Sequence, residues 1–422
     1  MQLEGSLCTI LAAMLALACS DPGPSSDAAS AGSGGSSAGS SAGGQGGSAA
    51  GAGSGGLTSK AGASGSAGTT AAAGSAGSAG SAAGGGPAHV VADCDGLGAV
   101  DEWQEITPPD VDPSIDLGFI SVTADPTTAG TIYTGTAKQG LWKSTDCGAT
   151  WAKANTGNHA DVLDSGLLWF VKADPSKADN LYAASLYGSD PSLLKSTNGG
   201  TDWDSLFPPG SDVASTVQYN FFQDAGLDIT NPAHLVATFH ADCSGEFGPM
   251  CMAESTDSGA TWRIFKGPTG GWGERAGAIV FDATTFIFHT WADGMFYTSD
   301  SGQTWENVAG GSNFAMYRAS DDYYYLGSAF GMLRTLDGHE WTKVDGAPNG
   351  DPLVGDGIRM FTAFDDANPK FMTALESDPT TWTTWATPNF THRVAGFAYD
   401  KDHHVLYTPN TNDGLWRVVT RE

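Results

Sequence analysis

A turn motif that recurs along the chain constrains its fold more than any other feature. Near copies occupy 144–151, 255–262 and 298–305, each reading Ser or Thr, x, Asp, x, Gly, x, Thr, Trp. A looser copy occupies 196–203 and a shorter one 335–341. The Asp or Asn oxygen can accept N–H groups of a tight turn, Gly supplies a positive φ, and Trp opens the next strand. The motif therefore predicts repeated β-hairpins, in which the acidic or amide residue is structural: Asp146, Asn198, Asp257, Asp300 and Asp337.

Short apolar runs that end on an acid recur in phase with these turns. They occupy 120–125, 168–174, 221–228, 278–282, 317–321, 360–365 and 394–400. A second β-rich run follows each of them, as at 131–134 and 180–183. Near-continuous apolar runs of this length are typical of strands buried between packed sheets. The pattern predicts seven repeating units, each opening on one of these runs as its innermost strand.

Seven tryptophans are expected to open the fourth strand of each unit, and one of them precedes the first unit. They are Trp103, Trp151, Trp203, Trp262, Trp305, Trp341 and Trp385, with Trp382 as an alternative to the last. The final unit stops after 415–419 and lacks a fourth strand of its own. If 103–106 supplies that strand, the seven sheets close into a ring and no sheet edge is left open at the seam.

The turn motif resembles the Asp-box, or bacterial neuraminidase repeat, of β-propeller proteins. This resemblance implies an all-β fold: a single seven-bladed β-propeller closed by an N-terminal strand, over 93–422. The family includes sialidases, xyloglucan-active glycoside hydrolases, sortilin-type receptors and photosystem assembly factors, so the fold alone does not give the function. Sialidases hold the substrate carboxylate with three arginines, the first early in the propeller, whereas the first Arg here is Arg263, in the third unit. A sialidase is therefore disfavoured, and no catalytic residue of the xyloglucan-active enzymes can be carried over.

The N-terminal region predicts export and anchoring. An apolar run over 7–18 is too short to span a bilayer and suits a signal-peptide core, so 1–19 is expected to be a signal peptide. Its end at Cys19 resembles the lipobox of bacterial lipoproteins, which implies lipidation of Cys19; ordinary cleavage near Ala18 and a mis-chosen start codon are the alternatives. Residues 20–92 are almost entirely Gly, Ser and Ala, a composition expected to form a disordered linker. The expected location is the bacterial outer membrane or cell surface, or otherwise the medium.

The charge excludes some partners. The chain has 47 acidic and 19 basic side chains, a formal net charge of -28. Nucleic acid and anionic membrane surfaces require clustered Lys and Arg, so neither is expected as a partner, and membrane contact is expected only through the N-terminal lipid. We expect a monomer without a cofactor or catalytic metal, although acidic loops leave a structural Ca²⁺ open.

Four cysteines lie beyond the leader, and an even number in an exported chain favours two disulfides. The expected pairs are Cys243 with Cys251, which closes a short loop, and Cys94 with Cys147, which joins the start of the domain to its first turn. A zinc site is the competing interpretation, but no CxxC or HxxxH spacing supports it.

Ligands of propellers usually bind over the central channel, on the loops that lead into the innermost strands and those between second and third strands. Candidate acids and bases in these loops are Asp116, Asp164, Tyr219, His240, Glu246, Glu274 and His289. Candidate substrate-binding side chains are Trp272, Trp291, Arg275, Arg359, Arg393 and His392. Each also has a structural interpretation: a buried histidine, an arginine paired with local acids, or a core tryptophan.

Three functions fit these residues. The first is a surface enzyme acting on polysaccharide. A hydrolase would use two of Asp116, Asp164, Glu246 and Glu274, whereas a uronate lyase would use an arginine to stabilise the carboxyl group and His240, His289 or Tyr219 as base. The second is a non-catalytic propeller that binds a glycan or a protein, and the third is an assembly or scaffold factor.

Overall fold

The structure, a computed structural model, describes part of the chain: 89–94, 96–188, 190–217, 222–269, 276–290, 293–310, 312–328, 331–364 and 368–420. These residues belong to one compact unit, Ala79–Glu422. The predicted leader and most of the predicted linker lie outside the described residues. So do six predicted site residues: Cys19, Tyr219, Trp272, Glu274, Arg275 and Trp291.

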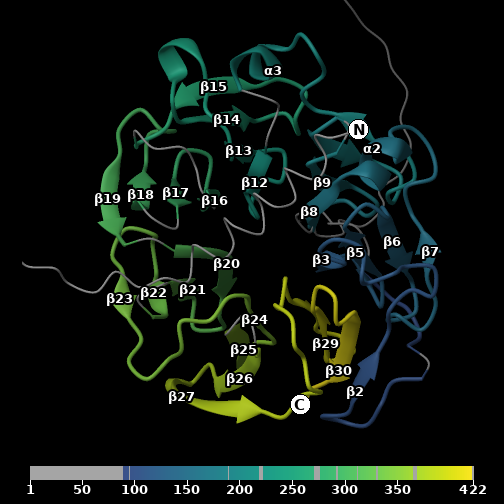
Figure 1. The fold of residues 1–422 in the computed structure, drawn as a ribbon. Coiled ribbons are helices and arrows are strands. Elements are labelled where there is room, and N and C mark those ends of the chain that lie inside the picture. Colours follow the sequence, from purple (N-terminus) through teal and green to yellow (C-terminus); the bar gives the residue numbers. More distant parts are fainter. Residues whose placement is uncertain are drawn as a thin grey trace, which may run out of the picture. The chain divides into compact units, whose positions relative to one another are not determined.

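Seven four-stranded antiparallel sheets follow one another around a ring, which confirms the predicted seven-bladed β-propeller (Figure 1). Each sheet, or blade, has its innermost strand beside the central channel and its fourth strand at the rim. From the innermost strand outward, the first blade is β3 (Phe119–Ala124), β5 (Ile132–Thr136), β6 (Leu141–Ser144) and β7 (Ala152–Lys153); the second is β8 (Leu167–Ala173), β9 (Leu181–Leu186), β10 (Ser192–Ser196) and β11 (Asp204–Ser205); and the third is β12 (Phe222–Leu227), β13 (Leu235–Phe239), β14 (Cys251–Ser255) and β15 (Arg263–Lys266). The fourth blade is β16 (Gly277–Val280), β17 (Phe286–Thr290), β18 (Gly294–Thr298) and β19 (Glu306–Ala309), and the fifth is β20 (Ser312–Arg318), β21 (Tyr324–Ser328), β22 (Leu333–Thr335) and β23 (Thr342–Lys343). The sixth blade is β24 (Leu353–Gly355), β25 (Arg359–Phe364), β26 (Lys370–Leu375) and β27 (Asp378–Trp385), and the seventh is β28 (Ala398–Asp400), β29 (Val405–Pro409), β30 (Leu415–Val419) and β2 (Trp103–Glu105).

The seventh blade is closed by the N-terminal strand, as the sequence predicts. Strand β2 pairs antiparallel with β30, with Trp103 opposite Val418 and Glu105 opposite Trp416. The Trp103 indole packs on the rings of Trp385 and Phe371 in the sixth blade, at centroid distances of 5.2 and 5.3 Å. Closure therefore joins the two ends of the domain both by a strand pair and by aromatic packing across a blade seam.

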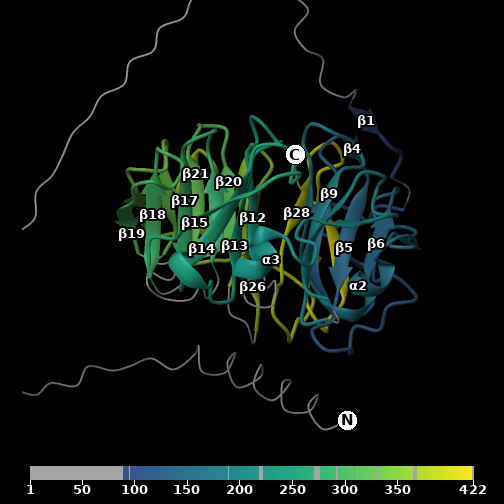
Figure 2. The same ribbon diagram turned by 90° about the horizontal axis from the view of Figure 1, so that it is seen from above.

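Antiparallel strand order gives the ring two faces of different character. On the loop face lie the loops that lead into the innermost strands and those between second and third strands, including 106–118, 137–140, 154–166, 240–250, 386–397 and 410–414. These loops hold the short helices α2 (Ala160–Ser165), α3 (Asp212–Thr216) and η2 (Gly245–Phe247). The opposite, turn face carries the repeated turns and a two-stranded pairing of β1 (Val90–Val91) with β4 (Thr128–Ala129) (Figure 2). No helix in the described part is long and apolar enough to cross a bilayer.

The repeated turns are held by the hydrogen bonds that their composition predicts. In the first, Ser144 Oγ accepts from the Gly148 amide at 2.7 Å and Asp146 Oδ1 accepts from the Thr150 amide at 2.8 Å. The turns built on Asn198, Asp257, Asp300 and Asp337 repeat this arrangement. Hydrogen bonds from Thr304 lower the pKa of Asp300 to about 2. These carboxylates therefore stabilise turns and stay ionised, as a structural role requires.

Each repeated turn also packs against the preceding blade. Gly302 has φ +78°, and a Cβ there would lie 2.5 Å from the ring of Phe265 in the blade before. Gly148 and Ile106 repeat the contact across the closing seam. At four seams the residue three places after a Trp (Ile106, Ala154, Leu206 or Phe265) faces the glycine of the next turn, whereas Gly338 faces Phe281.

Cations link three of these seams. Arg417 donates to the Cys147 carbonyl at 2.7 Å, Lys195 to the Ser258 carbonyl at 2.9 Å, and Arg263 to the Ser301 carbonyl at 2.6 Å. Cys147, Ser258 and Ser301 all have left-handed backbones, with φ of 60°, 60° and 57°. The bend at that position turns the carbonyl outward, where the preceding blade's cation can reach it.

The sixth blade differs from the prediction. The run 360–365 is not its innermost strand, because Leu353–Gly355 pairs with Arg359–Phe364 and takes the inner place. Asp356 follows β24 and accepts amide hydrogens from Ile358 and Arg359, as Asp125 and Asp174 do after their own innermost strands. The prediction was wrong by one strand because the second strand of this blade is as apolar as an inner one.

Candidate functional site

Two carboxylates predicted as catalytic lie on the loop face, in separate ion pairs. Asp116 Oδ2 is 3.1 Å from Lys138 Nζ, and only 14% of its side chain is exposed. In the next blade seam, Asp164 Oδ2 is 2.7 Å from Lys153 Nζ, and Asp164 Oδ1 accepts from Asn155 Nδ2 at 2.7 Å. Both groups therefore sit where the sequence predicts, but each is paired with a lysine of its own.

His392 and Asp413 form a pair on the same face. His392 lies in the loop leading into β28, and Asp413 lies between β29 and β30, with 2.8 Å from His392 Nδ1 to Asp413 Oδ1. The other oxygen, Asp413 Oδ2, accepts from the backbone amides of Thr391 and His392 at 2.6 and 2.7 Å. Burial alone would raise the pKa of Asp413, but the hydrogen bonds from His392 and Thr391 lower it.

This pair has a defined chemical polarity. Because an ionised Asp413 can only accept, His392 Nδ1 is the donor of this pair, and Nε2 lies on the far side of the ring. The His392 side chain is 47% exposed, so a ligand can reach Nε2. Arg393 follows in the same loop and is partly buried. The sequence placed His392 at this mouth but did not predict its pairing with Asp413.

A disulfide braces the longest loop between second and third strands in the described part. Cys243 and Cys251 are bonded, with Cα atoms 5.9 Å apart, which confirms the predicted pair. The Ser244 amide donates to the Thr216 carbonyl at the end of α3. His240, partly buried, and Glu246, exposed, are the predicted site residues of this loop. The brace holds both at the loop face, on the third blade.

The sequence predicts His289 in a loop, but it is a fully buried residue of β17. It pairs with Gly277 of β16, where a Cβ would lie 2.3 Å from His289 Nε2. The ring therefore fills the space that the missing side chain leaves. Burial lowers the pKa of His289 from 6.5 to about 4, and the position favours the structural interpretation of this histidine.

We expect His289 to make the fold acid-sensitive. Because the pKa of His289 is about 4 in the folded protein, against 6.5 for an ordinary histidine, the unfolded chain binds a proton at pH values between these two at which the folded chain does not. The contribution of His289 to the free energy of unfolding should therefore be intact above pH 6.5 and fall by about 3 kcal/mol as the pH drops to about 4. Urea unfolding of the wild type and His289→Gln across this range measures the effect as the difference between their pH slopes. Equal slopes would contradict it.

Lys172 and Asp224 form a charged pair that sequence reasoning missed. Lys172 Nζ, from β8, lies 2.5 Å from Asp224 Oδ1 and donates to the Ala225 carbonyl of β12 at 2.8 Å. Both residues belong to innermost strands, and the pair joins the second and third blades. The available signal was Lys172 itself, a cation inside the apolar run 168–174.

Arg359 was predicted at the loop face and lies on the other one. It begins β25, the second strand of its blade, and follows the Asp356 turn on the turn face. It lines a small cavity of about 210 Å³ there, with Thr373, Leu375 and Thr381. This correction follows from the shifted strand order of the sixth blade, and it separates Arg359 from Arg393.

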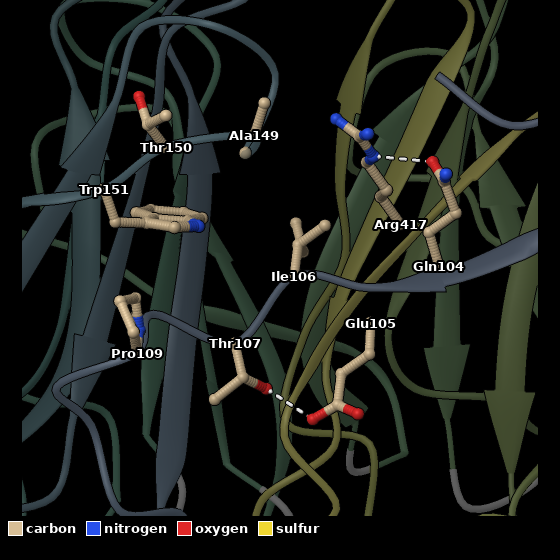
Figure 3. Close-up of a pocket in the computed structure, with 10 residues that line it drawn as sticks. Gln104, Glu105, Ile106, Thr107, Pro109, Ala149, Thr150, Trp151 and Arg417 are labelled. Carbon is tan, nitrogen blue, oxygen red and sulfur yellow. Dashed lines mark hydrogen bonds between the residues drawn. The ribbon is translucent and has the colours of Figure 1, made fainter. Parts of the chain in front are cut away.

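A larger cavity, of about 440 Å³, lies at the seam between the seventh and first blades (Figure 3). It is lined by the end of β2 and the segment after it, by Arg417 and by the first repeated turn. In Figure 3 the Trp151 indole and Pro109 form one wall, and on the other Glu105 accepts a hydrogen bond from Thr107 Oγ1 at 3.0 Å. None of the predicted catalytic residues lines this cavity.

One group of potential metal ligands occurs among the described residues: Cys94, Cys147 and His403. Cys94 and Cys147 are bonded to each other, with Cα atoms 5.4 Å apart, as the sequence predicts. Their sulfurs are therefore bonded to each other, which agrees with the disulfide interpretation of these cysteines rather than with the zinc site.

The fold and its loop face define a β-propeller of the kind found in several solved structures. No protein-family model matches the chain, and no curated protein matches it. It is similar to the GH74 xyloglucanase from Xanthomonas campestris, at 15% identity and a TM-score of 0.54, over 75% of this chain and 53% of that one. The GH74 enzyme of Niastella koreensis gives 15% and 0.54, over 71% and 52%.

YCF48 bound to D1 peptide is also similar, at 14% identity and a TM-score of 0.51, over 77% of this chain and 99% of that one. This chain spans about half the length of the two GH74 structures. At such identities the likeness shows the β-propeller fold alone.

Proposed function

We propose that this chain is an exported propeller whose loop face binds an extracellular polysaccharide or other glycan without turning it over. The observation that carries the proposal is the geometry of the two predicted acids. Asp116 and Asp164 each form a separate ion pair, with Lys138 and Lys153. Carboxylates fixed in this way can accept hydrogen bonds from sugar hydroxyls, whereas a glycosidase needs two carboxyl groups that act on one bond, one of them as the acid.

Two further features support binding at this face. The two described acids of this face with a shifted pKa, Asp112 and Asp413, both have it lowered by hydrogen bonds that they accept, which favours acceptors over proton donors. The Cys243–Cys251 bridge and the Asp413 hydrogen bonds fix two loops of the face in advance. A preorganised surface loses less entropy when it binds.

We expect Asp116→Asn with Asp164→Asn to weaken glycan binding at least about tenfold, the loss of one or two charge-assisted hydrogen bonds. Retention on an affinity gel of each polysaccharide in a panel, followed by calorimetry with the best one, measures it. Asp161→Asn is the matched control, because Asp161 is an exposed acid on the same loop as Asp164. A wild-type protein that no glycan retains would contradict the proposal.

A second candidate is a lyase acting on uronic acids, and the His392–Asp413 pair is the observation that favours it. His392 Nε2 would abstract the proton beside the carboxyl group, and Arg393 would stabilise the charge on that group. The same panel decides between the two candidates when absorbance of unsaturated product is read alongside retention. Retention without product supports binding, whereas product that His392→Gln abolishes supports the lyase.

Anchoring at a bacterial surface through Cys19 belongs to the same proposal. The two disulfides support export, because such bonds persist in oxidising compartments. The mass of the mature N-terminal peptide tests it, since a lipidated Cys19 and a free terminus near Ala18 differ by the acyl chains.

A further inference from the structure

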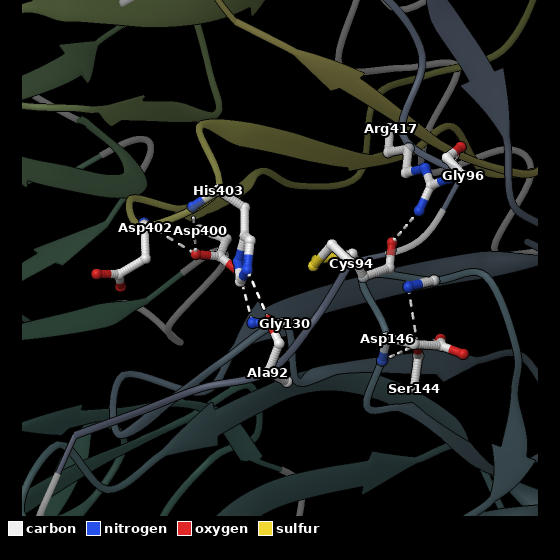
Figure 4. Close-up of a disulfide and its surroundings, with 12 residues drawn as sticks. Ala92, Cys94, Gly96, Gly130, Ser144, Asp146, Asp400, Asp402, His403 and Arg417 are labelled. Atoms are coloured by element: carbon white, nitrogen blue, oxygen red, sulfur yellow. Dashed lines mark hydrogen bonds and ion pairs between the residues drawn. A yellow bond between two sulfur atoms is a disulfide. The ribbon is translucent and has the colours of Figure 1, made fainter.

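The chain segment before the closing strand is fastened across the turn face. We call this segment, residues 89–99, the strap. Val90 and Val91 of the strap pair in parallel with Thr128 and Ala129 of the first blade. Three residues further on, Cys94 is bonded to Cys147 in the first repeated turn, so the strap is joined covalently to the first blade (Figure 4).

The seventh blade holds the same strap from its other side. His403 Nε2 lies 2.8 Å from the Ala92 carbonyl, and His403 Nδ1 lies 2.8 Å from Asp400 Oδ2. Asp400 Oδ2 also accepts from the Gly130 amide of the first blade at 2.6 Å. The strap therefore lies over the seam between the last and the first blade, the one seam that closes the ring.

Arg417 connects the strap to the closing strand. Its guanidinium donates to the carbonyls of Gly96 and Cys147, each at 2.7 Å (Figure 4), and to Gln104 Oε1 at 3.0 Å (Figure 3). Gln104 belongs to β2, whose pairing with β30 covers only three residues. Cys94 lies N-terminal to β2, so the Cys94–Cys147 disulfide joins the strap to the first blade without passing through this three-residue pairing.

We propose that the Cys94–Cys147 bond carries tension that enters from the N-terminal side directly into the first blade and keeps it off the closing strand β2. The covalent path runs from residue 94 directly to residue 147, so the segment 95–146 between them, β2 included, lies outside the loaded chain. Without the bond, the same tension would pass along 95–102 into β2 and its three residue pairs with β30. The use of this clamp on a cell surface rests on the proposed anchoring through the N-terminal leader; its mechanics do not.

Single-molecule pulling of the full chain, with one handle at each terminus, tests the clamp. In oxidised wild type we expect one main rupture with no earlier step. In the Cys94→Ser, Cys147→Ser variant we expect a first event at lower force, as β2 peels from β30 and releases residues 89–118, a step of roughly 10 nm. The Cys243→Ser, Cys251→Ser variant removes the other disulfide and should match wild type in its first event.

If the Cys94→Ser, Cys147→Ser variant does not fold, a second measurement on the wild type tests the clamp. Folded wild type is pulled in dithiothreitol, which is oxidised as the disulfide becomes two thiols, and the early step should appear as reduction proceeds. A bridge-free or reduced protein whose first rupture matches the oxidised wild type in force and extension would overturn the clamp. Glycan retention and the N-terminal mass are independent of this outcome, so failure of the clamp and failure of the proposed function are told apart.

Discussion

Replacing Arg417 with methionine is expected to lower the free energy of unfolding by about 2–4 kcal/mol, because one buried and two partly buried acceptors lose their donor at once. Arg417 is 4% exposed, and all three of its acceptors are neutral: the Gly96 and Cys147 carbonyls and the Gln104 amide oxygen. Burial lowers the pKa of Arg417, while Tyr407 and Asp146 act in the opposite direction. Methionine fills much of the volume but donates no hydrogen bond, so the buried Cys147 carbonyl is left unsatisfied and the link between three segments is lost.

Arg318→Met is the matched control. Arg318 pairs with Asp322 at 3.0 Å, but the two side chains are 49% and 77% exposed, and such a pair contributes at most about 1 kcal/mol. Urea midpoints of both variants, followed by circular dichroism, give the comparison. Arg417→Lys should recover only part of the loss, because one ammonium group cannot reproduce the fork of the guanidinium. Equal losses in the two methionine variants would show that Arg417 does not hold the closure.

The parts of the fold that the sequence predicts correctly depend on local chemistry. The repeated turns require Asp or Asn, Gly and Trp at fixed spacing, so each turn is recognisable without knowledge of the rest of the chain. Five such turns lie in phase with seven apolar runs, and it is the runs that give the number of blades. The last unit, which lacks a fourth strand of its own, then requires Trp103–Glu105 in that place. The disulfides follow in the same way, because Cys147 lies inside a turn whose position is already known.

The sixth blade shows where this reasoning fails. Its third and fourth strands are joined at Glu376 and Ser377, without the motif that marks the first five units. Its innermost strand is only three residues long, and the second strand is the more buried of the two, so apolar character points to the wrong strand. The sequence Leu353-Val-Gly-Asp356 does end on an acid, as the other inner strands do, but nothing local ranks it above 360–365. Arg359 was placed on the wrong face for this reason alone.

The candidate site was predictable as a face but not as a set of contacts. Loop membership follows from strand order, which correctly placed Asp116, Asp164, His392 and Arg393. His392 and Asp413 are 21 residues apart, and their contact depends on how two loops of one blade bend toward each other. His289 was misplaced because alternation along a strand does not show where the strand ends, and its true neighbour, Gly277, lies on another strand.

Trp203→Ala should destabilise the protein far more than the same change at Trp151, although both residues follow a repeated turn. Trp203 is fully buried in the core between the first and second blades, and its indole donates to the Gly200 carbonyl at 2.7 Å. Removing it leaves a large cavity and an unpaired acceptor, at a loss of about 3–5 kcal/mol.

Trp151 is only partly buried and lines the 440 Å³ cavity at the closing seam, and its Nε1 has no hydrogen-bond partner among the described residues. Truncation there enlarges a space that is already open to solvent, so about 1–2 kcal/mol is expected. Urea unfolding followed by far-ultraviolet circular dichroism compares the two without relying on tryptophan emission. Equal losses in the two variants would mean that the turn tryptophans stabilise the protein through the turn itself, because the motif is common to both. A loss confined to Trp203→Ala would mean that burial between blades, which the motif does not encode, determines how much each tryptophan contributes.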